Sequence, residues 1–471
     1  MKNQTAKVFL LFVVALLGLP VYAQQPQKIK SADERYKVDI LVVVAHPDDE
    51  GAATPYLARA IYDLHKSVAV VFGTRGGSGG NDYRREHGPA LADVREIEAR
   101  QACAKLGIDK VWFLGGKDTA SQNVLNSLAN WGHGESLEEL VRIVRLTRPE
   151  VILTWLPGIF VGENHGDHQA SGVLATEAFD LAADAVAFPA QLSGASKRLE
   201  PYLENLAPWQ PKKIYFFSDA NDQKQFAGLG PAYSVREISP SQKKPYWRMA
   251  LDAAKPHLTQ FPEDIEHISQ MSDADLEKMM SDPKAGWWND PDTLIFGKMV
   301  VSGGVASDVF SGINTGEEIP GIVLHRQLAS ILNATPEPQL HLGGPWLFYQ
   351  EFRQAHGLIN LPVRKIPEIG VKSGSPLYIP LVVTHKAGTS AEVSLKTNVP
   401  DGWKVTSGEG QLILPAESQT ALRIEVQTPE LSAEALKAAK PQEIVVQLSV
   451  SGNPAGEVRL NVLLRNTGLP Q

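Results

Sequence analysis

The chain has 471 residues, enough for two or three domains, and its apolar content of 43% is typical of globular proteins. A formal net charge of −8 and the lack of a dense basic run argue against a nucleic-acid partner. The single cysteine, Cys103, excludes an intrachain disulfide, and we expect it to be a buried, inert thiol.

The N-terminus has the pattern of a secretory signal peptide. Lys2 and Lys7 precede an apolar run at residues 8–19, and Ala23 offers a small residue for cleavage. The run is short for a membrane span, so we expect no stable membrane insertion after cleavage, with an uncleaved anchor as the alternative. The sequence therefore predicts a signal peptide at 1–23 and a secreted or periplasmic protein.

The next ordered stretch is an apolar, β-branched run at residues 40–44, which predicts a strand buried on both faces. It is followed at once by His46, Asp48, Asp49 and Glu50. Carboxylates at such a place could simply cap a following helix. An imidazole beside three carboxylates at the end of a buried strand also suits metal binding and acid–base chemistry.

Alternating elements follow in chain order. Helical periodicity predicts helices at 52–65, 93–106, 136–146 and 168–186, and apolar runs predict strands at 67–72, 110–114, 150–157 and 213–217. Ser136 is the expected N-cap of the third helix. The glycine-rich segment 74–80 is either a flexible turn or a substrate lid in which Arg75 contacts the substrate.

A second polar cluster follows the predicted strand at 150–157, in the segment 162–168, which contains His165, Asp167 and His168. The βα alternation predicts an α/β fold with a Rossmann-like, doubly wound parallel sheet of strand order 3-2-1-4-5. In that order the first and fourth strands are neighbours, and both clusters lie at the switch point where such sheets bind ligands.

The two motifs together, AHPDDE after the first strand and H-x-D-H after the fourth, resemble those of the PIG-L (LmbE-like) zinc-dependent N-deacetylases over roughly residues 38–218. The resemblance implies that His46, Asp49 and His168 bind Zn²⁺, or another divalent metal such as Fe²⁺. Such a site keeps one coordination position open for water.

The resemblance also implies catalytic roles for three further residues. Asp48 matches the general base, and His165 matches the histidine that stabilises the oxyanion and can protonate the leaving amine. Asp167 would orient His165 and hold it charged. Arg75 and Asp118 end neighbouring strands and are candidates for substrate contacts. Where the family often has proline in the second motif, this chain has Gly166, which should loosen the loop.

The remaining chain divides at about residue 365. Residues 221–364 show helical patches at 246–255 and 272–280 and read as an extension packed on the catalytic domain, which we place at 36–220. From 365 to 468, short alternating runs separated by turn signals predict a β-sandwich that resembles immunoglobulin-like domains of secreted enzymes. This domain could be structural or could bind sugar.

The resemblance implies hydrolysis of an N-acyl group, which we expect to be the acetyl group of an amino sugar such as N-acetylglucosamine or of its glycoconjugate. The small-molecule or glycan substrate comes from the resemblance alone. The alternatives are deacylation of a non-sugar amide and noncatalytic carbohydrate binding on the same scaffold.

Overall fold

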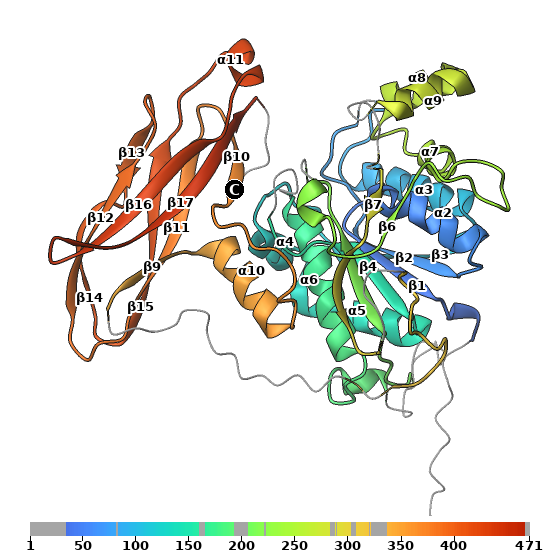
Figure 1. Ribbon diagram of the computed structural model, residues 1–471, viewed down its shortest axis with the longest axis horizontal. Helices are drawn as coiled ribbons and strands as arrows, with labels where there is room; N and C mark the ends of the chain where they lie inside the picture. Colours follow the sequence, from blue (N-terminus) through green and yellow to red (C-terminus); the bar gives the residue numbers. More distant parts are fainter. Residues whose placement is uncertain are drawn as a thin grey trace, which may run out of the picture.

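The computed structural model describes residues 34–81, 83–159, 165–192, 206–220, 223–282, 288, 290–302, 308–319, 321 and 337–466. The expected signal segment and residues 162–164 of the second motif lie outside these ranges. In Figure 1 an α/β unit is followed by a strand-rich unit, called here the β unit, with helix α10 between them.

A six-stranded sheet of order β3-β2-β1-β4-β5-β8 forms the centre of the α/β unit. Its strands are β1 (Ile40–Val44), β2 (Val68–Thr74), β3 (Lys110–Gly116), β4 (Val151–Trp155), β5 (Lys213–Phe217) and β8 (Ile295–Met299). The first five strands run parallel, which confirms the predicted order 3-2-1-4-5. Strand β8 was not predicted, and it pairs antiparallel with β5.

Both faces of this sheet are buried, as the apolar run at 40–44 indicated. Leu41 and Val43 of β1 belong to the hydrophobic cluster on one face, whereas Ile40, Val42 and Val44 belong to the cluster on the other. The first face is covered by α4 (Val124–Asn130), α5 (His133–Thr147) and α6 (Gly166–Leu181), and the second by α2 (Thr54–Tyr62), α3 (Pro89–Lys105) and α7 (Tyr246–Ala254). Cys103 is buried in the second cluster.

Helix α5 begins before Ser136, so the predicted N-cap is wrong. The N-cap is Gly132, whose backbone has φ 62, a left-handed conformation that glycine adopts without steric cost. Ser136 lies inside the helix, and its hydroxyl donates a hydrogen bond of 2.7 Å to the Trp131 carbonyl.

The segment 221–364 contributes elements to both units. On the α/β unit it adds α7, α8 (Pro262–Gln270), α9 (Asp273–Ser281) and the paired strands β6 (Ala232–Tyr233) and β7 (Asp292–Thr293). Trp247 and Leu251 of α7 pack with Leu276 and Met280 of α9 in a small separate cluster. Helices α7 and α9 confirm the helical patches, whereas α8 was not predicted.

The β unit consists of two sheets that share one hydrophobic cluster, with strand orders β10-β17-β16-β12-β14 and β13-β15-β11-β9. Its elements are β9 (Gln339–Leu342), β10 (Glu368–Lys372), β11 (Pro376–His385), β12 (Ala391–Asn398), β13 (Lys404–Ser407), β14 (Gly410–Leu414), β15 (Ser418–Gln427), α11 (Ala433–Lys437), β16 (Gln442–Val450) and β17 (Asn453–Arg465). Two sheets around one core agree with a C-terminal β domain, and its likeness to immunoglobulin-like domains stays a prediction. Strand β9 precedes residue 365 in the chain.

Helix α10 (Gly344–Ala355) contacts the cores of both units. Tyr349 and Phe352 belong to the large cluster of the α/β unit, whereas Trp346 belongs to the cluster of the β unit. Gln122 of the α/β unit also donates a hydrogen bond of 2.6 Å to the carbonyl of Gly370 in β10. The two units are therefore joined by packing and by hydrogen bonding.

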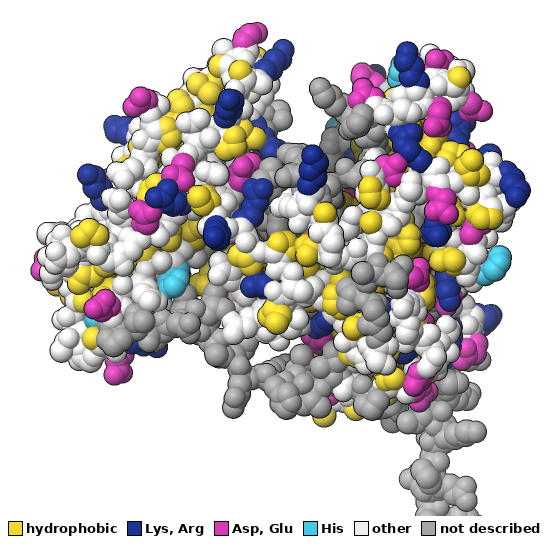
Figure 2. Space-filling model, in the orientation of Figure 1, with side chains coloured by type: hydrophobic (Ala, Val, Ile, Leu, Met, Phe, Trp, Pro, Cys, Tyr) yellow, Lys and Arg dark blue, Asp and Glu magenta, His cyan; other side chains and the backbone are white. Residues whose placement is uncertain are grey.

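The surface gives no single charged patch on the face seen in Figure 2, where Lys and Arg side chains are interspersed with Asp and Glu. Among the helices that the structure describes, none combines the length and apolar character that a membrane crossing requires.

Candidate metal centre

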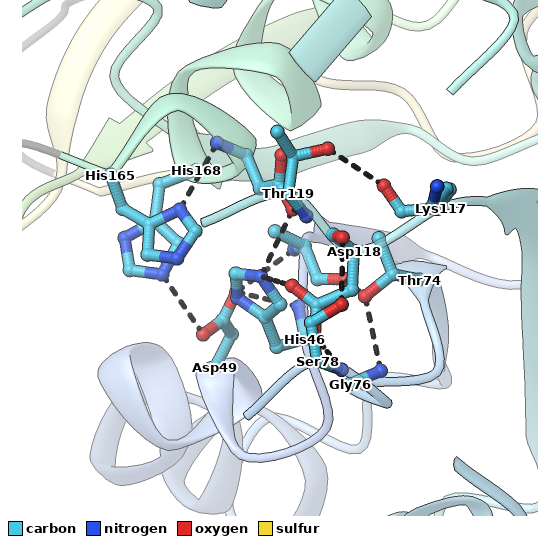
Figure 3. Close-up of polar contacts among 12 residues, drawn as sticks. His46, Asp49, Thr74, Gly76, Ser78, Lys117, Asp118, Thr119, His165 and His168 are labelled. Carbon is cyan, nitrogen blue, oxygen red and sulfur yellow. Dashed lines mark hydrogen bonds and ion pairs between the residues drawn. The ribbon is translucent and has the colours of Figure 1, made fainter. Parts of the chain in front are cut away.

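Two histidine-containing motifs meet at one edge of the central sheet. His46 follows β1, and His168 lies in the first turn of α6, which follows β4. Because β1 and β4 are parallel neighbours, their carboxyl ends lie side by side. The potential ligand atoms of His46, Asp49 and His168 all lie within 4.8 Å of one another (Figure 3). The structure thus brings together the three residues proposed as metal ligands.

Asp49 is oriented so that one of its carboxylate oxygens remains available to bind a metal ion. Its Oδ2 accepts hydrogen bonds from the backbone N–H groups of Ala45 and His46, both at 2.9 Å, and from Nε1 of Trp155 at 3.0 Å. Its Oδ1 lies 3.3 Å from Nε2 of His168. Burial favours the neutral acid, but the two imidazoles outweigh it and hold the pKa of Asp49 well below its ordinary value. Asp49 is therefore fixed as a carboxylate.

Trp155 supports two of these residues, and the sequence analysis missed it. Besides donating to Asp49, its indole stacks on the His168 ring at 4.3 Å between centroids, with the planes only 2° apart. The available signal was an aromatic residue at the last position of the fourth parallel strand, directly before the second motif. Trp155 fixes both a carboxylate and an imidazole of the cluster.

His46 lies among carboxylates. Its Nε2 is 3.4 Å from Asp118 Oδ1 and 3.3 Å from Asp167 Oδ2, and its Nδ1 is 3.6 Å from Asp49 Oδ2. Burial alone would lower the pKa of His46, but these carboxylates raise it well above its ordinary value. These carboxylates therefore stabilise a positive charge at the His46 ring. A divalent cation bound to the neutral imidazole would supply such a charge as well. The imidazole and carboxylate donors and the one-sided hydrogen bonding of Asp49 fit a zinc-type ion.

The partners of Asp167 and His165 differ from the predicted pair. The Asp167 carboxylate accepts the Thr119 N–H at 2.8 Å and faces His46. Only the backbone N–H of Asp167 reaches His165, donating to Nδ1 at 3.2 Å. That bond needs a lone pair on Nδ1, so the proton of the His165 ring is on Nε2. Burial, with repulsion from His46 and His168, lowers the pKa of His165 to about 2. The prediction that Asp167 holds His165 charged is therefore wrong, because the carboxylate is turned toward His46.

A second trio, His46, His165 and Asp167, also has its ligand atoms within 4.8 Å of one another among the described residues. Both trios need His46, and the Nδ1 atom of His165 is already occupied by a backbone N–H. We therefore favour the trio of His46, Asp49 and His168.

Asp48 has an unusual backbone, with φ 108 in the left-handed region that non-glycine residues rarely adopt. It lines a cavity of about 450 Å³ together with Asp49 and His168. Burial and repulsion from Asp49 raise the pKa of Asp48 to about 7. A carboxylate beside the proposed ligands, facing a cavity, is placed as a general base requires.

Part of the cavity lining comes from segments of the chain that carry no motif. It includes Phe217 at the end of β5, Ala253 of α7, and His257, Phe261 and Trp288 from the extension. Residues of the segment 221–364, which we predicted to pack on the catalytic unit, therefore shape the space next to the proposed ligands.

Arg75 and Asp118, the candidates for substrate contacts, both have partners within the protein, and their role toward a substrate stays a prediction. Arg75 is ion-paired with Asp93 and with Glu96 of α3, because two carboxylates on that helix attract its guanidinium. Asp118 faces His46 and accepts the Ser78 N–H at 2.8 Å. The structure thus brings Asp118 into the cluster beside His46, whereas the Arg75 guanidinium is paired with two carboxylates of α3.

The glycine-rich segment is held by a buried arginine of α3. Arg95 donates to the Gly76 carbonyl at 2.6 Å and to the Gly80 carbonyl at 2.7 Å. Glu98, three residues further along α3, accepts two hydrogen bonds from Thr259. These contacts tie the segment to α3 and to the extension.

Gly166 does not loosen the second motif. It is buried at the start of α6, and its N–H donates to the Ser121 carbonyl at 2.7 Å. A Cβ atom there would lie 2.9 Å from the Asn123 carbonyl oxygen and 2.7 Å from Ser127 Oγ. A proline would lack that N–H and collide with α4, so glycine lets the motif approach α4 closely.

Replacing Trp155 by phenylalanine should keep the stacking on His168 but remove the hydrogen bond to Asp49 Oδ2. Loss of such a supporting hydrogen bond lowers metal affinity by about 10–100-fold. Competition with a chromophoric chelator would measure the affinity. Trp112 of β3, which packs on Tyr36, offers the matched control Trp112→Phe. Equal affinity in Trp155→Phe and wild type would contradict the support assigned to Trp155.

The fold and the site together define a Rossmann-like α/β protein with a His–Asp–His cluster at the switch point of its sheet. Residues 41–179 match the family model described as PIG-L: GlcNAc-PI de-N-acetylase. The chain is 31% identical over 221 residues to the 1D-myo-inositol 2-acetamido-2-deoxy-alpha-D-glucopyranoside deacetylase 2 of Frankia alni, which covers 40% of this chain and 70% of that protein. The chain therefore belongs to the PIG-L family.

Two further similarities differ in the share of each chain that they cover. The 1D-myo-inositol 2-acetamido-2-deoxy-alpha-D-glucopyranoside deacetylase 1 of Frankia casuarinae is 35% identical over 162 residues. The match covers 31% of this chain and about half (52%) of that protein. Among solved structures, the N,N'-diacetylchitobiose deacetylase from Pyrococcus horikoshii is 18% identical, with a TM-score of 0.38, covering 55% of this chain and 84% of that one.

Proposed function

We propose that this protein is a metal-dependent hydrolase that removes the N-acetyl group of an amino sugar or its glycoconjugate. The observation that carries the proposal is the convergence of His46, Asp49 and His168 beside Asp48, in a chain that belongs to the PIG-L family. The substrate class is supported by the relatives, whose names describe them as deacetylases of N-acetylated sugars.

We assign separate chemical roles to the metal ligands, Asp48 and His165. A divalent ion held by His46, Asp49 and His168 would polarise an amide carbonyl and lower the pKa of a water molecule. Asp48, facing the cavity, accepts the proton of the attacking water. His165, neutral with its proton on Nε2, donates a hydrogen bond to the oxygen on which negative charge develops. This role replaces the cationic one that the sequence suggested.

Two measurements on the purified protein test the proposal. The first is release of free amine and acetate from a panel of N-acetylated mono- and disaccharides. The second is metal content, with activity measured after treatment with a chelator and again after addition of Zn²⁺ or Fe²⁺. We expect turnover that is lost with the metal and restored by one of these ions. Stoichiometric metal without release of acetate from any sugar would favour a non-sugar amide or a binding function.

We also propose that the protein is exported and loses residues 1–23. The basic N-terminus, the short apolar run and Ala23 support this proposal. N-terminal sequencing of protein recovered outside the cytoplasm is expected to begin near Gln24. A mature chain that begins at Met1 would instead point to a retained anchor or to cytoplasmic residence.

A further inference from the structure

The catalytic loop, residues 46–51, is held from outside by side chains of the extension. His257, which follows α7, faces Glu50, with 2.6 Å between Nε2 and Oε1. Gln260 donates to the carbonyl of Pro47, and Trp288 Nε1 donates to the carbonyl of Gly51 at 2.8 Å. All three lie outside residues 41–179, the part that matches the family model.

Glu50 links His257 to the backbone of Asp48. Glu50 uses its other carboxylate oxygen, Oε2, to accept the backbone N–H of Asp48 at 3.1 Å. Glu50 and His257 are almost fully buried, at 4% and 2% exposed. The backbone of Asp48 is thereby held where φ is 108, a conformation that costs free energy in any residue other than glycine and persists only when its surroundings fix it.

We propose that His257 is a positioning residue for the general base: it fixes the Glu50 carboxylate, which holds the Asp48 backbone so that the Asp48 side chain faces the cavity. This inference rests on the proposed function. Without the clamp, the Asp48 backbone relaxes toward negative φ, and its side chain turns away from the substrate. His257 itself does not touch the reacting atoms.

A purely structural role would have other consequences. If His257 only anchors the extension, its loss lowers the melting temperature while the folded, metal-loaded protein keeps its turnover. If it positions Asp48, turnover falls with little change in KM, because substrate binding does not need the base. Displacement of a catalytic group by about 1 Å costs on the order of 10²-fold in rate.

The experiment compares His257→Ala, His257→Gln, Glu50→Ala and the double variant His257→Ala with Glu50→Ala, in the full chain. We expect His257→Ala to keep its metal and to lose about 10²-fold in kcat. Glutamine presents an N–H near the position of Nε2, so His257→Gln should recover most of that loss. Because the two residues act in series, the double variant should be no slower than the slower single variant. The matched control is His267→Ala, an exposed histidine of α8.

Hydrogen exchange of the peptide covering residues 46–54 gives a second measurement that does not depend on activity. It should be faster in His257→Ala than in wild type and near normal in His257→Gln. Unchanged exchange, unchanged kcat per metal-loaded site, multiplicative losses in the double variant or loss of metal in His257→Ala would each overturn the proposal. A wild-type protein that deacetylates nothing would instead refute the proposed function, while the exchange rates still decide whether His257 fixes the loop.

Discussion

Replacing Asp48 by asparagine is expected to leave the metal content unchanged and to lower turnover by about 10²–10⁴-fold, the usual contribution of a general base. Asparagine keeps the size of the side chain and its hydrogen bonding, but it cannot accept a proton. Asp48 shares its cavity with Asp49 and His168, whereas none of the hydrogen bonds that orient Asp49 involves the Asp48 side chain. The measurement is metal per protein beside the deacetylation rate.

The neighbouring residue provides the contrast. Asp49→Ala removes the carboxylate that lies between His46 and His168, so we expect loss of the metal and of activity together. His165→Ala should keep the metal and slow the reaction, because the developing oxyanion loses a donor. A metal-free Asp48→Asn protein, or one with full activity, would sink the division of roles between the adjacent aspartates while leaving the family assignment intact.

Gly172→Ala is expected to lower both stability and metal affinity. Gly172 lies in α6, one turn after His168, against the end of β4. A Cβ atom at this position would lie 2.2 Å from the carbonyl oxygen of Trp155 and 3.0 Å from the backbone nitrogen of Pro157. Since backbone atoms cannot swing aside, α6 must move away from β4. Overpacking of this kind costs about 1–3 kcal/mol. The same shift separates His168 from Trp155 and Asp49. Thermal unfolding and metal titration measure the two effects.

Gly134→Ala is the matched control for this variant. Gly134 also lies in a helix of the α/β unit, near the start of α5, but a Cβ atom there meets nothing within 4 Å. Alanine is favoured over glycine in helices by about 0.5–1 kcal/mol, so this variant should be as stable as wild type or slightly more stable. If both variants lose metal equally, close approach at Gly172 is not what holds His168 in place.

The sheet order could be predicted because each strand carried its own local signal. The run at 40–44 is apolar on both faces, and every strand from β1 to β5 alternates with a helix, which leaves few possible topologies. Strand β8 carried no such signal. Its residues Ile295–Met299 include Gly297 and Lys298, and its pairing with β5 is decided by packing far along the chain.

The candidate site was predictable in position but not in its internal contacts. Spacing placed the two motifs at the ends of neighbouring strands, and this was enough to bring His46 and His168 together. It could not show that the Asp167 carboxylate turns toward His46, since side-chain direction depends on which donors surround it. His257 had no signal at all, because a lone histidine about 200 residues from the motif becomes meaningful only through its contact with Glu50.

The path of the chain at strand β9 limits how the two units can move. The chain enters the β unit at β9, returns to the α/β unit with α10, where Leu358 and Leu361 join the large core cluster, and then crosses again to β10. A unit attached by a single linker can rotate freely about that linker. When the chain crosses between the two units several times, most of this rotational freedom is lost. Deleting everything after residue 365 would not detach a module cleanly. It would leave β9 without its partner β11, as an unpaired ribbon prone to aggregate.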